Sequence, residues 1–356
     1  MNITFLIGNG FDIGIGLKTR YENFYDEYIK IQEDDNENIK SFKKTLLKWQ
    51  NMSAEEKSEY KKIVDWADFE SAFGVHSIDF KIEEKAKYIE RFEHFVMSFN
   101  HYIELEEQSL SFTDKDKIVE VMKNAISSFY HIRQGDKNKI QNQYNKFGGS
   151  RIYNFISFNY TRTIDRCATI LKEALKNESK DVGKICHIHG YVDKNMITGV
   201  DNPSQIKNIE FAQDTEIVNE IVKPHQNRDA RTNYENEAIS LINNSNMICI
   251  YGMSIGETDK KWWSIIAKWL LGDKNRMLII LNHDDTYNER FTFLQTKIVN
   301  TMEEKFLNLS DLTDDDREEI RKRIFVGINY DIFAMNFMKK EKEPETIVID
   351  ITKNVS

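Results

Sequence analysis

The sequence predicts an α/β protein of Rossmann-like type, in which a mainly parallel sheet is interrupted by a large, entirely helical insertion. Three observations lead to this prediction. A short apolar run at residues 3–7 ends in Gly8-Asn9-Gly10. Short apolar runs alternate with helical patterns from residue 152 onwards, as expected for parallel strands joined by helices. Residues 34–148 contain few glycines and no proline, and their apolar residues recur three or four apart, as in amphipathic helices.

The chain starts with a strand and a glycine turn. Residues 3–7 are apolar and partly β-branched, which is typical of a buried strand. Glycines directly after a strand let the chain turn sharply and let a ligand approach the backbone. A following helix, expected at residues 21–31, would direct its free amide groups toward a phosphate. The third glycine comes at Gly14 or Gly16, so the usual dinucleotide fingerprint fails, and a tight turn without a ligand is the alternative.

Changes in composition divide the chain into three parts. Residues 1–33 hold the first strand, the glycine loop and a helix of the nucleotide-binding core. Residues 34–148 form the helical insertion, whose aromatic residues we assign to its own core. Residues 149–356 complete the Rossmann-like core. We predict that the insertion covers the pocket or forms an assembly surface.

The last part alternates between strand and helix patterns. Strands are expected over residues 152–158, 184–188, 247–251, 277–281 and 324–328. Helices are expected over residues 163–176, 232–243, 260–271, 284–304 and 313–323. Residues 195–208 have the composition of a loop.

Composition places the protein among ordinary globular proteins and excludes several classes. The 356 residues suggest two domains, or one domain with an insertion. The net charge of −9 argues against a nucleic-acid partner, and no apolar run is long enough to cross a membrane. Cys167, Cys186 and Cys249 are scattered, which argues against structural zinc and against a disulfide framework. We therefore expect a cytoplasmic protein without a metal.

Polar or glycine-rich clusters follow five predicted strands. They are Gly8-Asn9-Gly10, Phe158-Asn159-Tyr160-Thr161, His187-Ile188-His189-Gly190, Tyr251-Gly252-Met253-Ser254 and Asn282-His283. In a doubly wound sheet these strand ends lie at one rim. Turns can be built from many residue types, so the repeated pattern favours a shared binding site.

The same clusters resemble those of a known family. Gly8-Asn9-Gly10-Phe11-Asp12, with Gly16-Leu17-Lys18-Thr19 and Tyr21, is similar to the N-terminal motif of the AbiH family of bacteriophage abortive-infection proteins. Four later stretches also resemble that family: Trp66-Ala-Asp-Phe-Glu70, Phe158-Asn-Tyr-Thr161, His187-Ile-His-Gly190 and Tyr251-Gly-Met-Ser-Ile-Gly-Glu-Thr-Asp259. The resemblance spans nearly the whole chain. Met253 stands where the family's Gly-His-Ser-Leu-like stretch has histidine, so a role for that histidine does not carry over.

A more remote resemblance links these clusters to sirtuins. Gly8, Gly10 and Gly16 keep the spacing of the sirtuin glycine loop, and Asn159 stands in the stretch that matches Thr-Gln-Asn-Ile-Asp. His189-Gly190 matches the catalytic His-Gly, while Gly252-Met-Ser-Ile255 and Leu281-Asn282 match two nucleotide-contacting stretches. The Pro-Asp-Phe-Arg segment and the four-cysteine zinc module are absent from the sequence. The resemblance therefore implies NAD or a related nucleotide more than deacetylation.

The candidate site follows from these matches and from the chemistry of the residues. Asn159 would hold the ribose or position water, His189 would accept a proton, and Asp12 would bind a ribose hydroxyl or orient the water. Gly8, Asn9, Gly10, Phe11, Gly16, Gly252, Ser254 and Asn282 would bind the nucleotide. Alternatives are a strand cap for His189, an Asx-turn for Asn159 and a helix N-cap for Asp12. His187, two residues before His189, is expected to be structural.

Two acidic positions have open roles. Glu70 either reaches over the pocket as a lid carboxylate or pairs with a surface lysine. Glu257 and Asp259 either bind a ribose or cap the following helix.

These observations predict an antiphage effector that hydrolyses NAD to nicotinamide and ADP-ribose. One alternative is a non-catalytic sensor that binds NAD or ADP-ribose and signals to a partner. Another is a phosphodiester-cleaving enzyme, for which the sequence offers neither a carboxylate metal cluster nor a basic groove. The protein would act as a homo-oligomer or together with a partner protein from a defence system.

Overall fold

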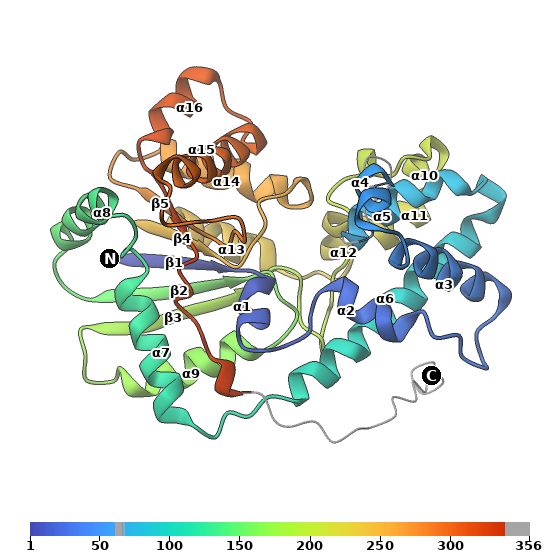
Figure 1. The fold of residues 1–356 in the computed structure, drawn as a ribbon, viewed down its shortest axis with the longest axis horizontal. Coiled ribbons are helices and arrows are strands. Elements are labelled where there is room, and N and C mark those ends of the chain that lie inside the picture. The colour runs from blue at the N-terminus through green and yellow to red at the C-terminus, as the bar shows by residue number, and fades with distance from the viewer. Residues whose placement is uncertain (61–65, 67, 339–356) are drawn as a thin grey trace. The chain divides into compact units, whose positions relative to one another are not determined.

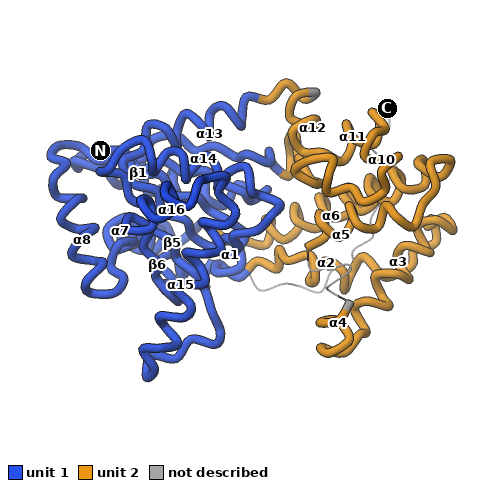
Figure 2. Tube along the Cα trace, turned by 90° about the horizontal axis from the view of Figure 1, so that it is seen from above, with its two compact units in different colours: residues 1–16, 112–191, 233–338 blue, residues 17–111, 192–232, 339–356 orange. Residues whose placement is uncertain are grey.

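The computed structural model describes residues 1–60, 66 and 68–338 and contains two compact units (Figures 1 and 2). Unit 1 consists of Met1–Gly16, Phe112–Tyr191 and Asn233–Met338. Unit 2 consists mainly of Leu17–Ser111 and Val192–Thr232. Each unit is therefore assembled from chain segments that are far apart in the sequence.

Unit 1 is built on a six-stranded sheet in which every pair of neighbouring strands is parallel. The strand order is β3-β2-β1-β4-β5-β6. This order, with the first strand in the centre, is that of the Rossmann arrangement. The strands are β1 (Asn2–Ile7), β2 (Arg151–Ser157), β3 (Lys180–His187), β4 (Met247–Tyr251), β5 (Met277–Asn282) and β6 (Ile324–Ile328). The predicted α/β class with a parallel sheet is confirmed.

Helices cover both faces of this sheet (Figure 1). On one face, strand residues such as Leu6 and Ile250 share an apolar cluster with Trp263 and Phe306 from the helices. On the other face, Phe5 packs edge-to-face on Phe129, with ring centroids 5.3 Å apart. The helices of unit 1 are α1 (Asn9–Gly14), α7 (Lys115–Ser128), α8 (Gln134–Lys146), α9 (Thr163–Ala174), α13 (Tyr234–Asn243), α14 (Lys260–Leu271), α15 (Thr292–Leu309) and α16 (Asp314–Arg321).

Unit 2 is helical and has an aromatic core of its own. Phe24 contacts Phe95 and Phe99 at centroid distances of 5.2 and 5.3 Å, and Phe73 stacks on Tyr88 at 4.6 Å. These rings lie at helical spacing, which is why the sequence places them on one face of each helix. The helices are α2 (Tyr21–Tyr28), α3 (Glu37–Gln50), α4 (Ala54–Tyr60), α5 (Phe69–His76), α6 (Lys85–Gln108), α10 (Ile209–Gln213), α11 (Thr215–Ile221) and α12 (Lys223–Asp229).

The compact units differ from the predicted division at both ends of the insertion. Residues 17–33 belong to unit 2, because α2 packs its aromatic residues on α6. Residues 112–148 belong to unit 1, where Phe129 just after α7 contacts Phe5 of the sheet. A second segment, Val192–Thr232, completes unit 2. Composition marks all amphipathic helices alike, so it does not show which core each helix joins.

Two helix starts differ from the prediction. The glycine turn leads directly into α1, a short helix that the sequence did not predict, and Gly16 with φ of 97° follows it; α2 then begins at Tyr21, as predicted. Residues 284–291 form turns, and α15 starts only at Thr292. The Asp284 side chain accepts from the Thr286 amide at 2.8 Å. Such a bond offers the backbone an alternative to the first helical turn, which explains the late start.

Glu70 forms a buried ion pair inside unit 2. Its carboxylate lies 2.9 Å from Lys223 Nζ, and Asp201 approaches the same ammonium group at 3.4 Å. Glu70 also accepts from the Gly199 amide at 3.3 Å. The Lys223 side chain is 4% exposed. Of the two predicted roles, the structure supports pairing with a lysine, although that lysine is buried rather than on the surface.

Lys223→Ala should destabilise unit 2 by about 3–5 kcal/mol, because it leaves buried carboxylates of Glu70 and Asp201 without their shared cation. Lys207→Ala is the matched control, since Lys207 is exposed and substitutions there should change stability by less than about 0.5 kcal/mol. Urea unfolding of both variants measures the difference. Equal stability of the two variants would contradict the assigned role of the pair.

Candidate functional site

The five predicted clusters lie at one rim of the sheet, at the carboxyl ends of the parallel strands. Strand register places Ile7 beside Ser157 and Tyr251, and Ser157 beside His187. Leu281 lies beside Tyr251 on the other side. The residues that follow these strand ends are therefore neighbours, and the predicted common rim is confirmed.

The glycine turn after β1 is bonded to the turn after β4. Gly8 donates its amide to Tyr251 O at 3.0 Å, and Gly10 donates to Gly252 O at 2.7 Å. Phe11 donates back to Gly8 O at 3.0 Å. These three amides thus bind backbone carbonyls within unit 1.

Close backbone packing explains why glycines occupy this turn. A Cβ atom on Gly10 would lie 2.5 Å from Gly252 Cα, and one on Gly8 would lie 2.6 Å from Gly252 O. Gly252 has φ of 67°, a conformation that L side chains rarely adopt. The close approach predicted at this turn is therefore made by another segment of the chain.

Asn159 is held at three of its polar atoms in the loop after β2. Its amide donates to Ser157 Oγ at 3.1 Å, and Nδ2 donates to Gly8 O at 3.1 Å. Its backbone carbonyl lies 2.9 Å from Nδ1 of His187. Because Gly8 O can only accept, Nδ2 must face it, and the side-chain orientation is fixed. Within the described part of the chain, Asn159 Oδ1 has no hydrogen-bond partner.

Asp12 lies inside unit 1 rather than at the N-cap of α1. It is 1% exposed, and both carboxylate oxygens lie within 3.0 Å of Thr161 Oγ1. The N-cap position belongs to Gly8. The Asp12 carboxylate thus links α1 to the loop that carries Asn159.

His189 lies two residues past β3 among aromatic side chains. Its ring centroid is 5.7 Å from that of Phe158 and 6.3 Å from that of Tyr160. Nε2 lies 3.8 Å from Asp259 Oδ1. Nδ1 is buried and has no hydrogen-bond partner among the described residues. In the tautomer that carries its hydrogen on Nε2, toward the Asp259 carboxylate, Nδ1 is an unmet acceptor.

The loop after β4 holds another group of unmet backbone donors. Among the described residues, the amides of Met253, Ser254 and Ile255 donate no hydrogen bond. Ser254 is exposed, whereas Ile255 is buried. Asn282 ends β5 and is half-buried at the same rim. In contrast to the amides of Gly8, Gly10 and Phe11, the three amides at residues 253–255 have no acceptor among the described residues.

The remaining predicted ligand residues have structural surroundings. Phe11 is fully buried and packs edge-to-face on Phe333, with centroids 5.3 Å apart. Gly16 follows α1 with positive φ, and Asn9 is the first residue of that helix. Tyr251 donates its hydroxyl to Asp331. Burial, followed by this carboxylate, raises the pKa of Tyr251, so the hydroxyl stays protonated.

Sequence reasoning missed one buried polar contact at this rim. His187 is fully buried, and its Nε2 lies 2.7 Å from Asp165 Oδ2 in the first turn of α9. The only signal for Asp165 was its place as an acidic residue in a first helical turn. That signal is common at helix starts and does not indicate a partner.

The cysteines take no part in this rim chemistry. Cys167, Cys186 and Cys249 are buried thiols without a disulfide. Burial is the main cause that raises the pKa of Cys167 and of Cys186 to about 12. Both thiols therefore remain protonated and unreactive near neutral pH.

A comparison with protein families assigns the chain. The sequence model described as bacteriophage abortive infection AbiH matches residues 4–281. The chain belongs to the AbiH family. The matched range contains every strand end that forms the rim except that of β6 and the last residue of β5. No curated protein matches the sequence.

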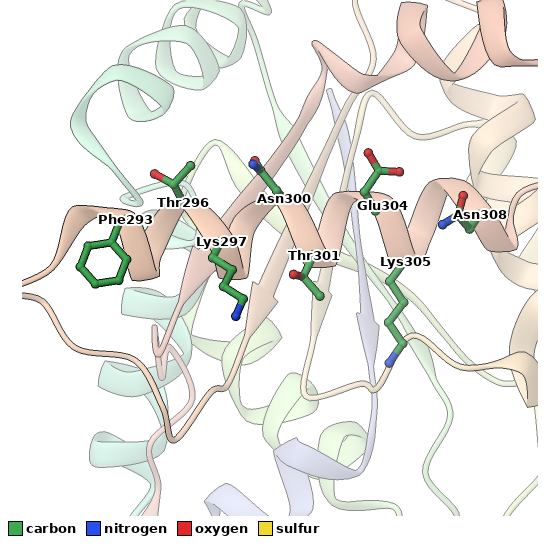
Figure 3. Close-up of a pocket in the computed structure, with 8 residues that line it drawn as sticks. All are labelled: Phe293, Thr296, Lys297, Asn300, Thr301, Glu304, Lys305 and Asn308. Atoms are coloured by element: carbon green, nitrogen blue, oxygen red, sulfur yellow. The ribbon is translucent and has the colours of Figure 1, made fainter. Parts of the chain in front are cut away.

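The surface of this AbiH protein also has a hollow on α15, away from the rim residues. This hollow runs along one exposed side of α15 and is lined from Phe293 to Asn308 (Figure 3). Most of its lining residues have polar side chains, as expected for the solvated face of an amphipathic helix. Among described residues, no helix has the length and apolar character to cross a membrane, and no cluster of three metal-ligating side chains occurs.

Gly10→Ala in this AbiH protein should lower the free energy of unfolding by about 1–3 kcal/mol, because the new methyl group meets the Gly252 backbone. The matched control is Gly135→Ala in α8, where a Cβ meets nothing within 4 Å. Chemical denaturation of both variants gives the comparison. A Gly10→Ala variant as stable as the control would show that the two turns are not packed as described.

Proposed function

We propose that this AbiH protein is an abortive-infection effector that binds NAD at the carboxyl rim of unit 1 and hydrolyses its nicotinamide–ribose bond. Membership of a family described by bacteriophage abortive infection supports a role in defence. The observation that carries the choice of chemistry is the pair of unmet acceptors at the rim, Asn159 Oδ1 and His189 Nδ1.

Unmet acceptors select for a ligand that brings hydrogen-bond donors. His189 Nδ1 is buried, and leaving a buried acceptor unsatisfied costs about 1–3 kcal/mol, so a bound ligand that donates to it can recover up to that amount. Ribose hydroxyls and water both donate through O–H groups. Phe158 and Tyr160 beside His189 add aromatic surface against which a nicotinamide ring can pack. A nucleotide with ribose hydroxyls therefore fits this set of groups.

The reaction requires a base and a group that orients the ribose. The bond between ribose C1′ and the nicotinamide nitrogen breaks, and its electron pair leaves with neutral nicotinamide. Water adds to C1′, and His189 Nδ1 takes the proton that the water loses. Asp259, 3.8 Å from Nε2, stabilises the imidazolium ion that forms. Asn159 Oδ1 accepts from a ribose hydroxyl and fixes the sugar for attack.

The other predicted residues divide into two groups under this proposal. The unmet amides at Met253 to Ile255 and the Ser254 hydroxyl bind the diphosphate. Gly8, Gly10 and Asp12 keep the turn after β1 and the loop after β2 in place. The remote sirtuin resemblance agrees with this division for Asn159, His189 and Ser254.

The bonded glycine turn favours a second candidate, a sensor that binds the nucleotide without cleaving it. Because Gly8, Gly10 and Phe11 donate to backbone carbonyls, the strongest phosphate-binding feature of the sequence is already occupied. A weaker phosphate site suits reversible sensing of NAD or ADP-ribose. The two candidates differ in turnover and share the same rim.

Incubation of the purified protein with NAD should release nicotinamide and ADP-ribose in equal amounts, identified by chromatography. His189→Ala should lower the rate by about 10²–10⁴-fold while keeping NAD affinity, because it removes the proton acceptor. His131→Ala is the matched control, since His131 is an exposed histidine of unit 1. Its rate should equal that of the parent protein.

Other outcomes separate the candidates. Tight NAD binding without product in the parent protein would support the sensor. Full turnover in the His189→Ala variant would remove this histidine from the mechanism.

A further inference from the structure

We propose that His187 is a positioning residue that fixes the Asn159 loop through its Nδ1 hydrogen, with Asp165 anchoring the opposite side of its ring. This inference deepens the proposed function and rests on it for its catalytic meaning. The contacts themselves are independent of any ligand. His187 closes β3, Asn159 follows β2, and Asp165 lies in the first turn of α9.

The direction of the first hydrogen bond follows from the chemistry of its partners. His187 Nδ1 lies 2.9 Å from the backbone oxygen of Asn159. A carbonyl oxygen only accepts, so Nδ1 must carry the hydrogen and donate it. The neutral tautomer that has no hydrogen on Nδ1 is therefore excluded.

The second contact fixes the ring from its other side. Nε2 lies 2.7 Å from Asp165 Oδ2. A bare nitrogen facing a bare carboxylate oxygen at this distance would be repulsive, so a hydrogen lies between them. Tyr191 covers the ring with a centroid distance of 4.2 Å, and the Arg162 guanidinium lies 3.9 Å from the centroid of Tyr191. The imidazole is thus held by two hydrogen bonds and by one neighbouring ring, tilted by 34°.

The hydrogen bond from His187 helps to fix the position of the Asn159 side chain. Its amide, its carbonyl and its Nδ2 are bonded to Ser157, His187 and Gly8, and Oδ1 is the polar atom left for a ligand. Three fixed points determine where Oδ1 lies. Loss of the His187 donor would leave the buried carbonyl with only the longer contact from Ser157 Oγ, at 3.4 Å, and would loosen the loop. Displacement of a substrate-orienting group by about 1 Å can cost about 10²-fold in rate.

A purely packing role makes a different prediction. Phenylalanine is somewhat larger than histidine and keeps an aromatic ring beside Tyr191, but it has no donor. If His187 only fills space, His187→Phe should leave the Asn159 loop unchanged. If it positions Asn159, the variant should loosen the Asn159 side chain although the core stays filled.

The test uses nuclear magnetic resonance of the full-length protein without ligand. The parent protein should show a hydrogen on His187 Nδ1 and slow solvent exchange of the Asn159 side-chain amide. In His187→Phe that exchange should become about five- to tenfold faster, because the loosened loop weakens the bond from Asn159 Nδ2 to Gly8 O. His131→Phe, at an exposed histidine of unit 1, is the matched control and should leave the exchange unchanged.

Should His187→Phe not fold, the Nδ1 hydrogen of His187 in the parent protein keeps the inference testable, and Asp165→Asn serves as a conservative control. The new amide donates to Nε2, which preserves the Nδ1 hydrogen, so Asn159 exchange should stay within about twofold of the parent. A bare Nδ1 in the parent, or unchanged Asn159 exchange in folded His187→Phe, would overturn the inference.

The same variant separates this inference from the proposed function. With NAD, His187→Phe should lower kcat/KM by about 10²-fold, mainly through kcat, because the sugar is bound but misplaced. A parent protein without turnover would contradict the enzymatic proposal, while the resonance results would still decide the role of His187.

Discussion

The rim of this AbiH protein depends on direct backbone contact between the turn after β1 and the turn after β4. Two hydrogen bonds, from Gly8 to Tyr251 and from Gly10 to Gly252, join these turns. The contact leaves no room for a Cβ atom on Gly8, Gly10 or Gly252. Gly8 O then accepts from Asn159, so the position of Asn159 depends on the same turn. Neighbouring strand ends are therefore held by a chain of hydrogen bonds rather than by apolar packing alone.

The two histidines at the end of β3, His187 and His189, have different surroundings and, in our proposal, different roles. His187 is fully buried, and both ring nitrogens have partners. His189 lies at the rim, and its Nδ1 has no partner among the described residues. Residues two apart along a strand share a face, but β3 ends at His187 and residues 188 and 189 form a turn, so the two rings do not follow one strand face. One ring is thus suited to holding the backbone, and the other is available for a ligand.

Much of this arrangement could be predicted because it follows from local patterns. Apolar runs marked all six strands, and the parallel sheet brought the polar clusters to one rim. Three features could not be predicted. The amphipathic pattern of α7 resembles that of α6, yet the two helices belong to different units. The glycines of the first turn face Gly252, which is more than two hundred residues away in the sequence. The pairing of His187 with Asp165 requires the register of β3 beside β2 and α9.

The most direct test of the central claim is a crystal structure of the protein with ADP-ribose. We expect ribose hydroxyls within hydrogen-bond distance of Asn159 Oδ1 and His189 Nδ1, the two acceptors that the ligand-free rim leaves unmet. The diphosphate should contact the amides at residues 253–255. ADP-ribose bound away from this rim, or bound with both acceptors still without a donor, would contradict the claim that these residues form a nucleotide site.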